Sequence, residues 1–330
     1  MIKILKQFLF AGLFLTVALT LFIALALASQ NRCGNAERLT EQLNSVVAEK
    51  IVPASKPQNA LRVATLNCNN YLTERRRVEN GMVFWPKSKA ERAALARLIA
   101  KQNIDIIALQ EMGDKKHLRL LQNDLKKLGT DYKFACVLQG RDQTRHVAFL
   151  SKNPFLSVKE FAEEATMSRG VLAVVVETQP AGTPIAIFNI HLKSRLTRTK
   201  DDPNCARERA DEMKRVLEIV RGNAMMKNFI LLGDFNDVPE SQTLKIVEES
   251  QIFKRVPARD CAGETWTFSN RAKELKDTSD YILLSFPLAK KLCGNQIFIA
   301  DEGASRASDH RLLWCDLIFE NESREREKIR

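Results

Sequence analysis

The chain has 330 residues, of which 45% are hydrophobic and 28% are charged, and its formal net charge is +11. This composition excludes a disordered or low-complexity chain and leaves ample length for one large core or two smaller ones. The basic balance favours polyanionic partners, meaning nucleic acid, anionic lipid or phosphorylated small molecules.

The first predicted element is an uncharged apolar stretch at residues 8–28, preceded by Lys3 and Lys6. It is long enough to span a bilayer as a helix, and its cationic flank favours export of the rest of the chain. Ala28 before Ser29 also fits a signal-peptide cleavage site. Residues 1–28 are therefore predicted to be a signal peptide or a membrane anchor of a periplasmic or extracellular protein, secreted or tethered. All seven cysteines follow this segment, but their odd number and spacing assign no disulfide pair.

Residues 29–60 are predicted to form a stalk, residues 61–320 a single domain, and residues 321–330 a charged tail. Ser88 and Glu91 form the capping signature of a helix, and further helices are predicted at 117–128 and 206–221. Strands are predicted at 61–66, 104–109, 132–138, 146–151, 171–177, 185–190, 229–232, 280–285 and 312–319. Many strands and few helices favour an α/β (α+β) fold with two packed sheets flanked by helices over a doubly wound single sheet.

The segment at 228–241 reads NFILLGDFNDVPES, in which four apolar residues lead directly into Gly-Asp-Phe-Asn-Asp. The apolar run predicts a strand that is covered on both faces. Gly233 is predicted to let the chain turn sharply at the end of this strand. Asp234 and Asn236 would then point into one crevice at the carboxyl end of a sheet. A plain turn is the alternative, because Asp, Asn and Gly are common turn formers.

Polar residues stand at the ends of several other predicted strands. They are Asn67, Glu111, His191, Asp280, Asp309 and His310. A mere turn at Asp234 would not explain this repetition, so we expect one functional site. Of the two remaining histidines, His146 is predicted to be structural and His117 to lie on the surface of a helix.

The residue types in this set suit phosphoester hydrolysis. Glu111, Asp309 and Asn67 offer oxygen ligands, which favour Mg²⁺ or Mn²⁺ over zinc. A hard cation polarises a phosphoryl oxygen, and two histidines with carboxylate partners can supply general acid and base. No covalent nucleophile is required, because the attacking group can be water.

Seven segments resemble, in the same order, those of the DNase I-like endonuclease/exonuclease/phosphatase superfamily, and most closely its bacterial branch of unassigned members. They are ATLNCNNYL, IIALQEMG, HVAFLSKNPF, FNIHLKS, LLGDFNDVPES, SDYILLS and ASDHRLL, and they cover residues 61–319. The resemblance implies a four-layered α/β/β/α sandwich with two mixed sheets packed face to face. It also implies divalent-metal-dependent hydrolysis of phosphoesters.

Carried over by position, the resemblance implies that Glu111 is the principal metal ligand, with Asn67 and Asp309 nearby. It implies that Asp234 and Asn236 orient the attacking water and bind the phosphate. Asp280 and His310 would form the carboxylate–histidine pair at the phosphorus, and His191 would serve the leaving group or the phosphate. Arg169 falls where relatives often place a phosphate-contacting arginine, with a structural ion pair as the alternative. Asn69 replaces an aspartate of some abasic-site endonucleases, which disfavours that activity.

Three kinds of partner remain open. Basic segments at 73–77, 193–200 and 270–276 favour a nucleic-acid backbone as the substrate. Lys193 and Arg195 would line the entrance to the site. Trp266 would either contact the substrate or pack in the core. A small or lipid-borne phosphoester is the second hypothesis, suggested by the membrane tether predicted at 8–28. A non-catalytic binding module of the same fold is the third. We expect a monomer.

Overall fold

The computed structural model describes residues 55–77, 81, 83–162, 167–178, 182–195, 200–223, 226–300 and 304–319. Residues 51–330 form one compact unit. The predicted signal peptide or anchor, most of the predicted stalk and the charged tail lie outside the described residues. Within the described residues, no helix has both the length and the apolar character needed to cross a bilayer.

Two mixed sheets form the centre of this unit. The first has the strand order β12 (Ala258–Arg259), β16 (Ile297–Ile299), β17 (Leu313–Ile318), β1 (Ala60–Tyr71), β4 (Ile106–Met112), β6 (His146–Ser151), β5 (Phe134–Leu138). The second has the order β11 (Phe253–Arg255), β15 (Asp280–Ser285), β10 (Phe229–Asp234), β9 (Pro184–His191), β8 (Val171–Glu177), β7 (Phe155–Phe161). The pairs β1–β4 and β9–β10 are parallel, so their carboxyl ends lie at the same edge of their sheets.

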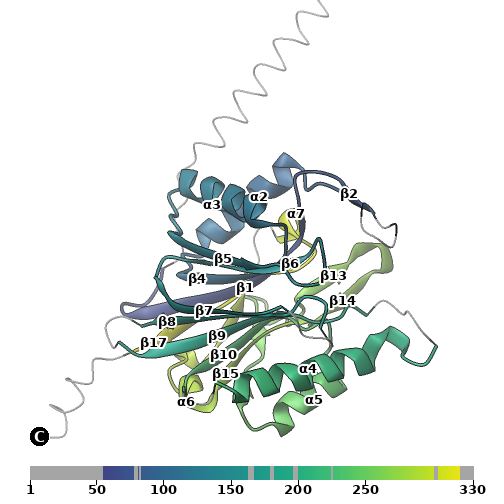
Figure 1. Ribbon diagram of the computed structural model, residues 1–330. Coiled ribbons are helices and arrows are strands. Elements are labelled where there is room, and N and C mark those ends of the chain that lie inside the picture. Colours follow the sequence, from purple (N-terminus) through teal and green to yellow (C-terminus); the bar gives the residue numbers. More distant parts are fainter. Residues whose placement is uncertain are drawn as a thin grey trace, which may run out of the picture. The chain divides into compact units, whose positions relative to one another are not determined.

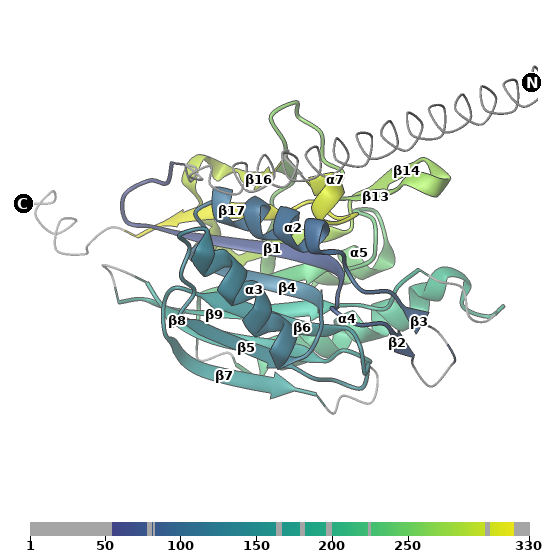
Figure 2. The ribbon, with the colours of Figure 1, turned by 90° about the horizontal axis from the view of Figure 1, so that it is seen from above.

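Helices cover the outer face of each sheet and complete the predicted α/β/β/α layers (Figures 1 and 2). The first sheet carries α2 (Lys89–Lys101) and α3 (Lys115–Lys127), and the second carries α4 (Ala206–Arg221) and α5 (Gln242–Glu249). The short helices are α6 (Phe286–Ala289) and α7 (Ala304–Ala307), with 3₁₀ turns at Pro203–Cys205, Arg271–Lys273 and Cys293–Asn295. Two small hairpins stand apart from the large sheets: β2 (Arg76–Arg77) with β3 (Val83–Phe84), and β13 (Phe268–Asn270) with β14 (Leu275–Asp277).

The two-residue period of β10 explains its continuous apolar run. Ile230 and Leu232 enter the core between the two sheets, whereas Phe229 and Leu231 pack in the core beneath α4 and α5. A strand buried on both faces has no position for a polar side chain until it leaves the sandwich. The prediction of a doubly covered strand is confirmed.

The predicted helices are present, and Ser88 and Glu91 form the capping box at the start of α2. The short elements β2, β3, β11, β12, β13, β14, β16, α6 and α7 were not predicted, and neither were the longer β7 and α5. β7 is an edge strand whose side chains are mostly exposed, so it lacks a strong apolar pattern. α5 has eight residues, too few for a clear helical period.

Candidate active site

The polar strand ends converge because they continue the pattern of the inter-sheet core. On β1, β9, β10 and β15, every second residue packs between the sheets, as Val63, Ile187, Leu232 and Ile282 do. The same period carries four polar side chains to the rim of this core: Asn67, His191, Asp234 and Asp280. The side chains of all four residues are at least 98% buried. The site is therefore buried at one end of the sandwich, where the sequence predicted a crevice.

Asp234 is the centre of the crevice. Its Oδ2 atom accepts a hydrogen bond from Asn67 Nδ2 (2.9 Å) and lies 3.5 Å from His191 Nε2 and 3.8 Å from His310 Nε2. Its Oδ1 atom accepts a hydrogen bond from the backbone N–H of Asn236 (2.8 Å). The Asn236 side chain also donates to the carbonyl of Leu192 (3.1 Å), which joins the two loops that follow β9 and β10.

Gly233 sets the position of Asp234, but not through the turn that the sequence predicted. It lies within β10, paired with Ile190 of β9, and has φ of +136°. A Cβ atom at this position would lie 2.0 Å from the carbonyl oxygen of Ile190. The chain therefore requires glycine because two strands approach closely. The prediction of a turn at Gly233 is wrong, since the strand continues through Asp234.

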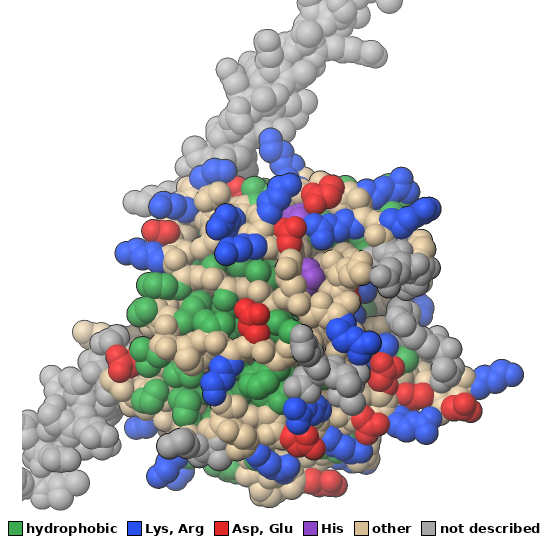
Figure 3. Space-filling model, in the orientation of Figure 1, with side chains coloured by type: hydrophobic (Ala, Val, Ile, Leu, Met, Phe, Trp, Pro, Cys, Tyr) green, Lys and Arg blue, Asp and Glu red, His purple; other side chains and the backbone are tan. Residues whose placement is uncertain are grey.

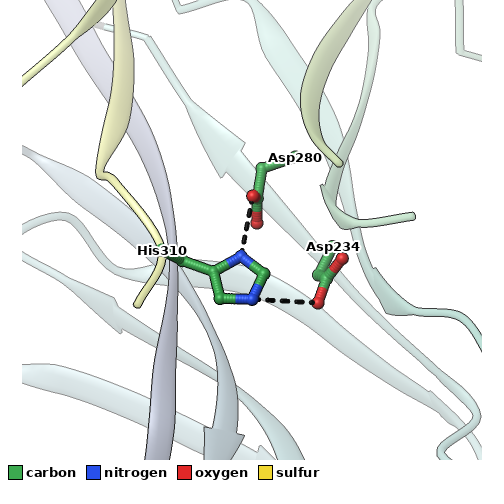
Figure 4. Close-up of side chains that lie close together, drawn as sticks. All are labelled: Asp234, Asp280 and His310. Carbon is green, nitrogen blue, oxygen red and sulfur yellow. Dashed lines mark hydrogen bonds and ion pairs between the residues drawn. The ribbon is translucent and has the colours of Figure 1, made fainter. Parts of the chain in front are cut away.

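Asp280 and His310 form the predicted pair (Figure 4). His310 Nδ1 donates to Asp280 Oδ2 across 2.8 Å, and His310 Nε2 points toward Asp234. The ring of Phe268 lies against the imidazole, with 4.8 Å between ring centroids. These three side chains thus form a chain of contacts in the order Asp280, His310, Asp234.

Thr267 supports this pair and was missed by the sequence analysis. Its hydroxyl donates to Asp280 Oδ2 (2.7 Å) and accepts the backbone N–H groups of Ser279 (2.9 Å) and Asp280 (3.0 Å). The segment TWTFS shows no pattern that distinguishes this threonine from an ordinary strand residue. Only its hydrogen bonds to Ser279 and Asp280, at the start of β15, make it a positioning residue.

The two site histidines differ in charge. Burial alone would lower the pKa of His310, but the carboxylates of Asp280 and Asp234 raise it to about 10. Burial lowers the pKa of His191 well below its usual value, and the positive charges of Arg169, Arg145 and His310 lower it further. Near neutral pH, His310 is therefore a cation and His191 is neutral. Burial also raises the pKa of Asp234 to about 7, which makes it a carboxylate able to accept a proton.

Two sets of side chains could hold a cation. Asp234, Asp280 and His310 each offer a ligand atom, and these atoms lie within 4.8 Å of one another. However, His310 is protonated and its Nδ1–H is bound to Asp280, so its nitrogens lack a free lone pair for a metal. This set is better suited to holding protons.

Glu111 and Asp309 fit a hard cation better. Burial raises the pKa of Asp309, His310 opposes this shift, and the negative charge of Glu111 adds to it, so the two carboxylates repel each other. A divalent cation would relieve that repulsion and would find oxygen donors. The backbone of Glu111 has φ of +53°, and its Oε2 atom accepts the N–H of Asn70 (2.9 Å), which holds the carboxylate in place.

Arg145 is a second residue that the sequence analysis missed. Its Nε atom donates to Asn70 Oδ1 (3.1 Å) and lies 3.5 Å from Glu111 Oε1. Its side chain is 21% exposed, so it lies at the mouth of the crevice rather than inside it. The sequence gives no signal for it, because its partner Asn70 lies 75 positions away.

The four predicted substrate-binding residues all have partners within the protein. Arg169 is buried, donates to the carbonyl of Leu192 (3.0 Å) and lies 3.3 Å from Asp142, which supports the structural alternative. The remaining contacts are Lys193 with Glu208 (2.6 Å), Arg195 with Asp277 (2.8 Å), and Trp266 beneath Arg311 (4.2 Å) and Lys276 (4.7 Å). These contacts neutralise much of the charge that a phosphate backbone would meet.

The prediction for His117 is wrong. This side chain is fully buried, with Nδ1 2.7 Å from Asp114 Oδ1 and Nε2 3.1 Å from Thr73 Oγ1. It faces Thr73 and Glu74 instead of solvent, because the loop between β1 and β2 covers this side of α3.

The model of the Endonuclease/Exonuclease/phosphatase family matches residues 64–310. Comparison with curated proteins finds no significant match. Among solved structures, the chain is similar to an endonuclease/exonuclease/phosphatase family protein from Leptotrichia buccalis, with 18% identity and a TM-score of 0.57 over 79% of this chain and 100% of that one.

Two further solved structures have 16% identity and a TM-score of 0.57, again over 79% of this chain and 100% of the other. They are sphingomyelinase C from Streptomyces griseocarneus and a variant of beta toxin from Staphylococcus aureus with bound magnesium ions. These similarities confirm the DNase I-like fold. The family match over three quarters of the sequence shows that the chain belongs to the endonuclease/exonuclease/phosphatase family.

Proposed function

We propose that this protein is a divalent-metal-dependent phosphodiesterase that cleaves nucleic acid by attack of water. Members of its family are generally phosphoester hydrolases, and the observation that carries the proposal is the chain from Asp280 through His310 to Asp234. The chain places a cation and a proton acceptor side by side, 3.8 Å apart, with both side chains at least 92% buried. Acceptance of a proton from water and stabilisation of phosphate charge are both required for phosphodiester hydrolysis.

In this mechanism Asp234, held by Asn67 and Asn236, orients the attacking water and takes its proton. His310, held by Asp280, presents positive charge to the phosphate as negative charge develops on it. His191 is neutral, and its Nδ1 atom is buried with no hydrogen-bond partner among the described residues, so it is available to the phosphate or the leaving oxygen.

Glu111, Asn67 and Asp309 would hold Mg²⁺ or Mn²⁺. When bound, the cation polarises a phosphoryl oxygen and stabilises the charge of the leaving oxygen. The residues fit this role because they are oxygen donors and because Glu111 and Asp309 repel each other in its absence. Arg145, beside Glu111, adds a fixed positive charge at the entrance.

The net charge of +11 supports nucleic acid as the substrate. A lipid-borne or small phosphoester is the second candidate, favoured by the apolar segment predicted at 8–28 and by the fold shared with proteins named sphingomyelinase C and beta toxin. That segment also supports an exported location. N-terminal sequencing of the protein from membrane and soluble export fractions would distinguish a retained anchor from a cleaved signal peptide, and intact Met1 in the cytosol would contradict both.

The deciding experiment incubates the full-length protein with plasmid DNA, RNA and phospholipid vesicles, in Mg²⁺ or Mn²⁺ and in EDTA. We expect cleavage of nucleic acid that EDTA abolishes. Glu111→Gln should lower activity by several orders of magnitude in a folded protein, whereas the exposed Glu218→Gln on α4 should behave as wild type. Full activity in EDTA, or in the Glu111→Gln variant, would contradict the metal assignment.

A thermal-shift measurement separates the two candidate cation sites. Mg²⁺ should raise the melting temperature of the wild type, because a ligand that binds the folded state stabilises it. Glu111→Gln should remove this shift, and Asp280→Asn should keep it. The reverse result would place the cation among Asp234, Asp280 and His310.

A further inference from the structure

The β2–β3 hairpin carries an exposed aromatic side chain among cations. Trp85 follows β3 and is 66% exposed, the most exposed of the large hydrophobic side chains in the described residues. The guanidinium of Arg75 lies over its ring, 4.2 Å from the centroid. Arg76 and Arg77 form β2 directly after Arg75. We call Arg75, Arg76, Arg77 and Trp85 the β2–β3 ridge.

The cations of the ridge are only partly neutralised. Arg76 lies 3.2 Å from Glu74 and 3.1 Å from Asp114. Within the part of the chain that the structure describes, neither Arg75 nor Arg77 forms an ion pair. Figure 3 shows Lys and Arg side chains at the upper right of this face, where the hairpin lies in Figure 1. The ridge therefore offers charge that the loop carrying Lys193 and Arg195 does not.

The ridge is connected to the active site through one side chain. Arg145 lies over the ring of Phe84 on β3, 4.2 Å from its centroid, and the same guanidinium group contacts Asn70 and Glu111. Phe84 itself is 9% exposed and anchors the hairpin. The hairpin that carries the ridge is thus joined to Glu111, one of the proposed metal ligands, through Phe84 and Arg145.

We propose that the β2–β3 ridge binds a single-stranded segment of nucleic acid, with a base stacked on Trp85 and phosphates along Arg75 and Arg77. This proposal rests on the proposed function and names its preferred substrate class. Stacking on an exposed indole requires a base whose face is free, which a paired duplex does not offer. The scissile phosphate must also enter a crevice whose central side chains are at least 92% buried, and a single strand is thin enough to do so.

A membrane contact at the ridge is the competing explanation, and the distribution of apolar side chains disfavours it. Trp85 is the one exposed large hydrophobic side chain described on the hairpin. Leu156 and Val158, 57% and 41% exposed, lie on the edge strand β7 of the second sheet, and Figure 3 shows a broad apolar area to the left of the face. An apolar surface suited to lipid therefore lies away from the ridge.

The test measures binding of the full-length protein to a fluorescein-labelled oligothymidine and to a duplex of equal length, in EDTA so that no cleavage occurs. Trp85→Ala should weaken binding to the single strand by about tenfold or more and binding to the duplex much less. Trp85→Phe should keep most of the wild-type affinity for the single strand. Phe286→Ala is the matched control, because Phe286 is also exposed (46%) and lies on α6.

A second measurement examines the binding of phosphates by the ridge. Changing Arg75 and Arg77 together to Gln should flatten the plot of log K against log salt, by roughly 0.7 for each single-strand phosphate that the variant no longer neutralises. Lys214→Gln, on the exposed face of α4, should leave the slope unchanged.

Equal losses on single strand and duplex, or no loss in Trp85→Ala, would overturn the proposal. Loss of binding to anionic phospholipid vesicles in Trp85→Ala, with oligonucleotide binding intact, would overturn it in favour of a membrane contact. Hydrolysis of bis(p-nitrophenyl) phosphate by the wild type with Mg²⁺ tests the proposed function separately. If that activity is present and the strand preference is absent, the inference about the ridge fails alone.

Discussion

His310 Nδ1 and Asp280 Oδ2 are 2.8 Å apart, and Asp280 is what makes His310 a cation at the centre of the crevice. One residue sets both the orientation and the charge of the other. A substitution of either residue should therefore remove the same function. His310→Ala, Asp280→Ala and the double variant should have similar kcat/KM values, since the two residues act as a unit. Losses that multiply in the double variant would contradict the pairing.

Thr267 provides a test of positioning without substrate contact. Thr267→Val keeps the shape of the side chain but removes the donor to Asp280 and the acceptor for two backbone N–H groups. We expect kcat to fall by roughly 10-fold to 100-fold, with little change in KM, because a misplaced pair affects the chemical step. The unfolding free energy should also fall by about 1–3 kcal/mol.

Thr267→Ser is the matched variant, since it keeps the hydroxyl and loses a methyl group. It should recover most of kcat. If Thr267→Ser is as impaired as Thr267→Val, the hydroxyl is not what positions Asp280.

Glu212 on α4 predicts a pH dependence of stability. Burial raises the pKa of its carboxyl from 4.5 to about 7, although it accepts the N–H of Lys193 at 2.6 Å. A raised carboxyl pKa means that the folded state binds the proton more tightly. The contribution to stability is therefore complete below about pH 4.5 and is lost as pH rises through about 7. Glu212→Gln can still accept the N–H but carries no charge.

Urea unfolding at about pH 5 and pH 8 measures this effect. Between these pH values the unfolding free energy of the wild type should fall by on the order of 1–3 kcal/mol more than that of Glu212→Gln. Glu208→Gln, a more exposed residue on the same helix, should follow the wild type. Parallel curves for wild type and Glu212→Gln would show that Glu212 is ionised at both pH values.

Gly233 predicts a steric effect. Gly233→Ala would bring Cβ to 2.0 Å from the carbonyl oxygen of Ile190, at a φ that disfavours any side chain. We expect a loss of roughly 3 kcal/mol or more in unfolding free energy and loss of activity, because Asp234 is the next residue. Gly263→Ala, also at positive φ (+84°) but with no atom within 4 Å, should cost about 1 kcal/mol at most. Similar melting temperatures for the two variants would contradict the close approach.

The convergence of four polar side chains was predictable from sequence: Asn67, His191, Asp234 and Asp280. Each of them follows or precedes a run of core residues, and the two-residue period of the strand places its side chain at the rim of the inter-sheet core. The order of the motifs supplied the family. Thr267 and Arg145 could not be found in this way, since their roles depend on contacts between distant segments. Arg145 reaches Asn70 across 75 positions of sequence. The partners of Lys193 and Arg195 were missed for the same reason. The acidic residues that pair with this basic loop lie on α4 and β14, outside the loop itself.

A buried amide pair lies directly beneath the site. Gln110 of β4 donates to Asn189 of β9 across 2.7 Å, and Asn189 donates to the carbonyls of Leu109 and Ala148. Gln110 precedes Glu111, and Asn189 lies two residues before His191, so this pair ties the strand of the proposed metal ligand to the strand of His191. Apolar packing alone sets no preferred lateral offset between two sheets, whereas an amide hydrogen bond does. Replacing Gln110 and Asn189 with aliphatic residues of equal volume could therefore give a more stable protein that is inactive. Each half of the site would be intact, but the two sheets would be offset from each other by about an ångström.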